Sequence, residues 1–216
     1  MSISWDKARF DAAAAALCNV GRELHRYGQV PATGGNFSVR LNDHCFAITR
    51  SGPHKGRLVP DDIIVADLDG KPLTDDPGKR PSAETLLHCQ LYKRDATIGA
   101  ALHSHCPPAV VLSRVLPTAA SFVLRGYELL KAFAGTDTHD TARSVAFFDN
   151  SQDIAALAAE VEARMQSGFE PPPAPGYIIR GHGIYAWGRD LDEAWRHLDA
   201  LDHLLAVELE VLRHTR

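Results

Sequence analysis

The stretch IGAALHSHCPPAVVLSRV, residues 98–115, constrains the fold of this chain more than any other segment. Its apolar part is too short for a comfortable helix and predicts a buried β-strand. His103 and His105 stand at the end of that run, and Pro107 and Pro108 then open a helix. Strand residues two apart point to the same face of a sheet, so the two imidazoles can lean together at a strand end, where α/β sheets place their sites.

The rest of the chain mixes helical and strand patterns, with a helix at each end. Pro81 and Ser82 stand where a helix start favours them, and Asn150 or Ser151 can cap a later helix. We expect strands at 36–41, 45–50, 63–70, 97–105, 144–149 and 177–188, and helices at 5–27, 81–94, 107–115, 126–135, 152–168 and 190–213. Residues 1–216 are therefore predicted to form a single α/β layered domain.

Composition excludes several classes of protein. The formal net charge of -4 provides no basic field for nucleic acid or an anionic membrane. No apolar run approaches the ~20 residues that a membrane span needs, and the N-terminus lacks the basic start of a signal peptide. The four cysteines form no CxxC pair and are too few for a disulfide framework. We therefore expect reduced thiols and a cytoplasmic location.

A third histidine strengthens the metal interpretation of the pair. His182 lies between Gly181 and Gly183 in RGHGIYAWG, and glycines let backbone approach closely while leaving the ring unobstructed. Three neutral imidazoles with an open coordination position suit a catalytic Zn²⁺, although other first-row divalent ions fit three nitrogens as well. An isolated HxH pair, in contrast, is more often two ordinary histidines. The helical His88, His197 and His203 have apolar neighbours and are predicted to be structural or surface residues.

Two glycine-bearing turns precede the histidines, TGGNFS at 33–38 and TRSGPHKG at 49–56. Backbone N–H groups in such turns form nests that bind anions. A helix start adds a favourable dipole for a phosphate. The candidate phosphate contacts are Gly34, Gly35, Asn36, Ser51, Gly52, Lys55 and Ser82. On residue chemistry alone, two tight turns that merely join strands explain these segments equally well.

Taken together and in this order, TGGNFS, ITRSG, PSAET, HSH and RGHGIYAWG resemble the class II aldolase and adducin family of zinc-dependent sugar-phosphate enzymes. The resemblance covers about residues 12 to 212. It implies an αβα layered domain with a mainly antiparallel central sheet. It also implies a homotetramer with sites between subunits and a small sugar phosphate as substrate.

The resemblance assigns roles to particular residues. His103, His105 and His182 match the zinc ligands of the family, with one ion for each subunit. The positions that match its phosphate site are Gly35, Asn36, Ser51, Gly52 and Ser82.

Two glutamates match different catalytic bases within the family. SGPHKGRL and GYELLKAFAGTDTH resemble the branch that dehydrates a sugar phosphate, in which a glutamate at the position of Glu128 is the acid/base. In the aldolases the base matches Glu84 of PSAET, which in a dehydratase would contact substrate. We expect a carbon–oxygen lyase that uses Glu128, with an aldolase or epimerase as the alternative. A non-enzymatic, adducin-like module is the third possibility, and the three intact histidines argue against it.

Overall fold

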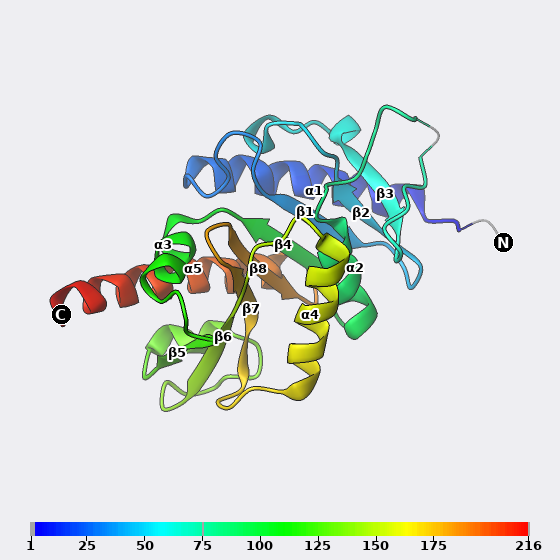
Figure 1. Ribbon diagram of the computed structural model, residues 1–216. Helices are drawn as coiled ribbons and strands as arrows, with labels where there is room; N and C mark the ends of the chain where they lie inside the picture. Colours follow the sequence, from blue (N-terminus) through cyan, green and yellow to red (C-terminus); the bar gives the residue numbers. More distant parts are fainter. Residues whose placement is uncertain (1–2, 75, 216) are drawn as a thin grey trace.

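A computed structural model describes residues 3–74 and 76–215, and an eight-stranded sheet lies at the centre of this part of the chain (Figure 1). The strands are β1 (Asn36–Arg40), β2 (Cys45–Thr49), β3 (Ile63–Asp67), β4 (Ala100–Ser104), β5 (Ser121–Arg125), β6 (Ala142–Phe148), β7 (Pro173–Ile179) and β8 (Gly183–Gly188). They lie in the order β3-β2-β1-β4-β8-β7-β6-β5. Only β6 and β7 pair in parallel among the described strands, so the expected α/β fold with a mainly antiparallel sheet is confirmed.

Helices cover both faces of this sheet, as the predicted αβα layering requires (Figure 1). They are α1 (Lys7–Arg26), α2 (Thr85–Arg94), α3 (Pro107–Val115), α4 (Ile154–Ser167) and α5 (Leu191–His214), with 3-10 turns η1 (Lys55–Arg57), η2 (Pro60–Asp62) and η3 (Glu128–Ala132). The buried side chains form two apolar clusters. One contains residues of α1, α3 and α5, and the other contains residues of α2 and α4. The sheet therefore has a separate core on each face.

Two helices begin later than their sequence patterns predict. The helix expected from Pro81 starts at Thr85, because Pro81 forms a β-bridge with Arg50 and the next residues form a turn. The cap of α4 is Asp153, whose carboxylate accepts the Ala156 N–H at 3.0 Å, rather than Asn150 or Ser151. The residues just before each helix therefore lie in loops, where their side chains can contact other parts of the chain.

Two strand features escaped the sequence prediction. Strand β5, at one edge of the sheet, is partly exposed and lacks a clean alternating pattern. Strand β7 begins at Pro173, four residues before the strand expected at 177–188. In the described residues, none of the helices has the length and apolar character that a membrane crossing demands.

The position of β4 determines where a site forms. This strand lies in the middle of the sheet, between β1 and β8. His103 is opposite Asn36 on β1 and Tyr185 on β8. The carboxyl end of β4 is therefore close to the start of β1 and to the turn between β7 and β8.

Candidate metal centre

The three predicted histidines meet at the end of β4. His103 is the fourth residue of the strand and fully buried, and His105 follows the end of the strand. His182 lies on the turn between β7 and β8. One ring nitrogen from each residue lies within 4.8 Å of the others. The structure thus brings together side chains that are far apart in the sequence.

Hydrogen bonds orient two of these rings. His103 Nδ1 donates to the Ile184 carbonyl at 3.0 Å, and His182 Nδ1 donates to Asn150 Oδ1 at 3.3 Å. Both Nε2 atoms are left with lone pairs, and they lie 3.3 Å apart. Two nitrogens bound tetrahedrally to one ion at ~2.05 Å lie roughly 3.3 Å apart, so the spacing fits a shared cation.

The electrostatics of the rings suit metal binding. Burial lowers the pKa of His103 to about 3, and burial also lowers the pKa of His105. Both imidazoles are therefore neutral near pH 7, the form that ligates a metal.

Glycines make room for the histidines. A side chain on Gly183 would collide with the Ser104 carbonyl, and one on Gly34 would lie 2.9 Å from His105 Nδ1. Gly181 has a φ of +65°, a backbone conformation that favours glycine. The close approach inferred from the sequence around His182 is thus present.

Glu84, the residue before α2, places its carboxylate against the same nitrogens. Its Oε1 lies 3.1 Å from His182 Nε2, and its Oε2 lies 3.3 Å from His103 Nε2. Burial acts to raise the pKa of Glu84, but the electrostatic attraction of His103 and His182 and the hydrogen bond from Asn36 outweigh it, so the pKa lies well below its usual range. Lone pairs and a carboxylate that converge in this way suit a positive charge between them, such as that of a divalent cation.

Glu128 lies elsewhere in the chain. It begins η3, its side chain is 69% exposed, and its partners are Lys131 and His139. Neither partner belongs to the histidine cluster. In a single chain, the structure therefore brings Glu84 to the histidines and leaves Glu128 on the surface.

The two glycine-bearing turns lie side by side. Lys55 is buried, and its Nζ donates to the Thr33 carbonyl at 3.0 Å and to the Pro53 carbonyl at 2.9 Å, one from each turn. Burial lowers the pKa of Lys55. The Ser51 N–H donates to the Arg80 carbonyl, which holds the second turn beside the segment that contains Ser82.

Two glycines shape these turns, and the side chain of the neighbouring Asn36 is buried. Gly35 and Gly52 have φ values of +81° and +102°, so both turns need glycine there. The Asn36 side chain, however, is 3% exposed and bonds to Glu84 and His88.

Three residues around the cluster escaped the sequence analysis. Asn150 accepts from His182, and Tyr185 stacks on His103 with ring centroids 4.3 Å apart and donates to Glu84 Oε2 at 3.2 Å. His88, expected to be merely structural, bonds to Asn36. The i, i+4 spacing of Glu84 and His88 was the available signal, because helical residues four apart share a face.

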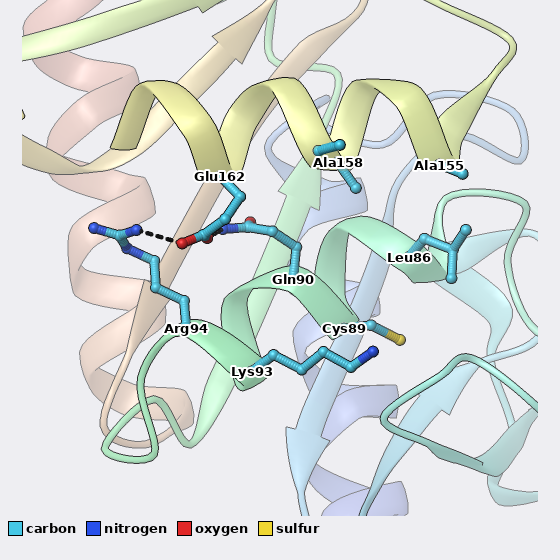
Figure 2. A pocket seen from close by; sticks show the side chains of 9 residues that line it. Leu86, Cys89, Gln90, Lys93, Arg94, Ala155, Ala158 and Glu162 are labelled. Carbon is cyan, nitrogen blue, oxygen red and sulfur yellow. Dashed lines mark hydrogen bonds and ion pairs between the residues drawn. The ribbon is translucent and has the colours of Figure 1, made fainter. Parts of the chain in front are cut away.

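A surface groove lies between α2 and α4, apart from the histidine cluster. Figure 2 shows that its walls come from these two helices, with Leu86 of α2 and Ala155 of α4 facing each other at one end. Arg94 pairs with Glu162 at 2.9 Å across the groove. None of the three histidines lines this groove, so the metal centre is a separate feature.

The family model for the Class II Aldolase and Adducin N-terminal domain matches residues 15–209. This chain belongs to the class II aldolase family. Among its curated relatives, a methylthioribulose-1-phosphate dehydratase of Xanthomonas campestris pv. campestris (strain B100) is 48% identical over 213 residues, which cover 98% of this chain and 94% of the relative. A methylthioribulose-1-phosphate dehydratase of Stenotrophomonas maltophilia (strain K279a) is also 48% identical, over 211 residues that cover 97% of this chain and 95% of the relative.

Solved structures of the class II aldolase family share the fold. An L-fuculose 1-phosphate aldolase superposes with a TM-score of 0.75 at 21% identity, over 95% of this chain and 88% of the other. The L-fuculose-1-phosphate aldolase from Thermus thermophilus gives a TM-score of 0.69 at 25% identity, over 94% of this chain and 97% of the other. The family is metal-dependent, and the three-histidine cluster of this chain agrees with that property.

Proposed function

We propose that this protein is a carbon–oxygen lyase that dehydrates 5-methylthioribulose 1-phosphate to 2,3-diketo-5-methylthiopentyl 1-phosphate in methionine salvage. The observation that carries the proposal is a three-histidine cluster with an adjacent carboxylate, in a chain 48% identical over nearly its whole length to dehydratases of that name. We further propose a cytoplasmic location and a homotetrameric assembly.

Zn²⁺ is the proposed cofactor, one per subunit, held by His103, His105 and His182. Three neutral imidazoles and an open position are the ligand set of catalytic zinc sites. When bound, the cation supplies Lewis acidity that stabilises negative charge on the oxygens of the substrate.

The residues of the chain have to move two protons. The substrate carries a ketone at C2 and hydroxyls at C3 and C4. The catalytic carboxylate, assigned to Glu128, takes the C3 proton, and the electron pair of that C–H bond forms the C3–C4 double bond as the C4–O bond breaks. The carboxyl group returns its proton to the departing hydroxide, which leaves as water. The resulting C3 enol becomes the second ketone when C4 takes up a proton and the C3 hydroxyl releases one.

The exposed position of Glu128 affects this assignment. Its carboxylate bonds to Lys131 and His139 on the surface, away from the histidines of its own chain. We infer that Glu128 acts in the site of a neighbouring subunit of the homotetramer. Glu84 would then contact substrate within its own subunit, where Asn36 and Tyr185 hold its Oε2.

The phosphate of the substrate is assigned to the paired turns. Gly35, Asn36, Ser51 and Gly52 offer backbone or side-chain donors, Ser82 offers a hydroxyl, and Lys55 adds a positive charge nearby. These contacts orient the substrate and take no part in bond changes.

Ser82→Ala tests this phosphate assignment. We expect KM for the phosphorylated substrate to rise about 10-fold, because a hydrogen bond to a charged group contributes about 1.5–3 kcal/mol. Metal content should stay that of the wild type, and Ser167→Ala, at the exposed end of α4, serves as the control. A variant that loses metal and keeps its KM would place Ser82 in a different part of the site.

A specific observation favours the aldolase alternative: Glu84, which matches the aldolase base, is the carboxylate that lies against the histidines. Product analysis of the purified, metal-loaded protein separates the two reactions. Dehydration of 5-methylthioribulose 1-phosphate yields the diketone and water, whereas retro-aldol cleavage between C3 and C4 yields dihydroxyacetone phosphate and (methylthio)acetaldehyde. Absence of the diketone at full metal occupancy would exclude the dehydratase.

A further inference from the structure

A continuous line of buried hydrogen bonds leads from Tyr92 to Glu84. The Tyr92 hydroxyl lies 2.7 Å from Ser38 Oγ, which lies 2.7 Å from His88 Nδ1. His88 Nε2 lies 2.5 Å from Asn36 Oδ1, and Asn36 Nδ2 lies 2.6 Å from Glu84 Oε2. The four residues behind Glu84 are each 3% exposed or less, so water does not compete for these bonds.

The direction of each bond follows from the chemistry of its ends. An ionised Glu84 only accepts, so Asn36 must turn its NH₂ group to the carboxylate and its Oδ1 to His88. His88 must then carry its proton on Nε2. Burial lowers the pKa of His88 to about 4, so the ring is neutral and Nδ1 accepts from the Ser38 hydroxyl. Ser38 in turn accepts from Tyr92, and every donor of the line points toward Glu84.

Packing holds the His88 ring in this orientation. His88 lies on α2, four residues after Glu84, and its ring meets the Tyr185 ring edge-on with centroids 5.5 Å apart. Tyr185 itself stacks on His103 and donates to Glu84. The ring of His88 is therefore fixed by the same side chains that surround the metal centre.

We propose that His88 is a positioning residue for Glu84. Its Nε2–H fixes the Asn36 amide, and that amide holds Glu84 Oε2 so that Oε1 faces His182. Without this bond the Asn36 amide can rotate by half a turn and present its oxygen to the carboxylate, which repels it. The effect on turnover rests on the proposed function, in which Glu84 contacts substrate. The His88 tautomer and the orientation of the Glu84 carboxylate, in contrast, can be measured on the protein without substrate.

The experiment compares three variants in metal-loaded protein: His88→Met, which removes the donor, His88→Gln, whose amide N–H can replace it, and Ser38→Ala, which no longer donates to Nδ1. We expect kcat to fall roughly 10-fold in His88→Met, at the lower end of the range for groups that orient a metal site. KM and metal content should be unchanged, Ser38→Ala should show a smaller fall, and His88→Gln should recover part of the loss.

A matched control and a double variant separate positioning from a structural effect. His197 is equally buried and bonds to Trp187 and Ala134, away from this line, so His197→Met should lose stability and keep kcat. In a Glu84→Ala background, His88→Met should lower kcat no further, because the group that it positions is gone. An additive loss would overturn the proposal.

Two measurements need no substrate and distinguish this proposal from the proposed function. Nitrogen-15 NMR of wild-type imidazoles should show His88 protonated at Nε2 and unprotonated at Nδ1. Crystals of metal-loaded His88→Met should show Glu84 Oε2 released from Asn36. If the wild type forms no diketone but both measurements give the expected result, only the proposed function is contradicted. A wild-type His88 protonated at Nδ1, or a Glu84 that stays bound to Asn36 in His88→Met, would overturn the positioning role.

Discussion

His103→Ala is expected to abolish metal binding and to lower turnover by at least about 10³-fold. His103 is fully buried, and its ring is held by the Ile184 carbonyl with Nε2 directed at the other two ligands. The alanine leaves two histidines, which bind a divalent ion far less tightly than three. Lewis-acid stabilisation is worth several kcal/mol, and each 1.36 kcal/mol changes the rate about tenfold.

Metal content per chain after dialysis is the primary measurement, with turnover as the second. His197→Ala removes a comparably buried imidazole outside the cluster, so it controls for loss of packing and should retain metal. Chelation of the wild type followed by addition of Zn²⁺ should abolish and restore turnover. Undiminished metal in His103→Ala would refute the ligand assignment.

Glu128→Gln is expected to lower kcat by about 10²–10⁴-fold while zinc content and KM stay close to those of the wild type. A general base contributes on that scale, and an amide keeps the shape of the side chain but cannot accept a proton. Because Glu128 is exposed and apart from the histidines in its own chain, the replacement should leave the fold intact. Glu84→Gln should cost less, since the dehydratase uses Glu84 to contact substrate. The aldolase mechanism predicts the opposite order.

Mixed assemblies test whether Glu128 serves a neighbouring subunit. Glu128→Gln and His103→Ala homo-oligomers, each inactive, are dissociated, mixed and reassembled. If the carboxylate and the histidines of one site come from different chains, some mixed sites contain both intact and activity returns. A mixture of Glu84→Gln and His103→Ala assemblies at the same concentrations is the control: both residues lie in one chain, so no mixed site contains both intact and no activity should be gained. No recovery, together with a near wild-type Glu128→Gln, would remove Glu128 from the mechanism.

The sequence allowed the three clustered histidines to be singled out as candidate ligands. His103 and His105 fall at the end of one apolar run, His182 lies between two glycines, and the structure brings the three rings together. The mainly antiparallel sheet and the αβα layers followed from the family resemblance and are confirmed by the structure.

The network around Glu84 could not be predicted, because it depends on register. Asn36 looks like a phosphate donor in TGGNFS, but the pairing of β1 with β4 places it opposite His103 and turns its amide toward Glu84 and His88. The later start of α2 likewise places Glu84 at the end of a turn rather than inside a helix. The proposed role of Glu128 involves a neighbouring subunit, and the sequence of one chain carries no local pattern for such a contact.

The placement of the proposed ligands on β4 and on the β7–β8 turn would couple cation supply to the lifetime of the chain. His103 and His182 are 79 residues apart, and the intervening polypeptide includes β5, β6 and α4. A cation held by both strand ends binds the native state and not the unfolded chain, which at a free concentration about 1,000 times Kd shifts the folding equilibrium by about 4 kcal/mol. A shift of that size lowers the unfolded fraction about 1,000-fold, and that fraction is what cellular proteases degrade. Loss of the proposed ion would therefore raise the unfolded fraction by the same factor and expose more of the chain to proteases.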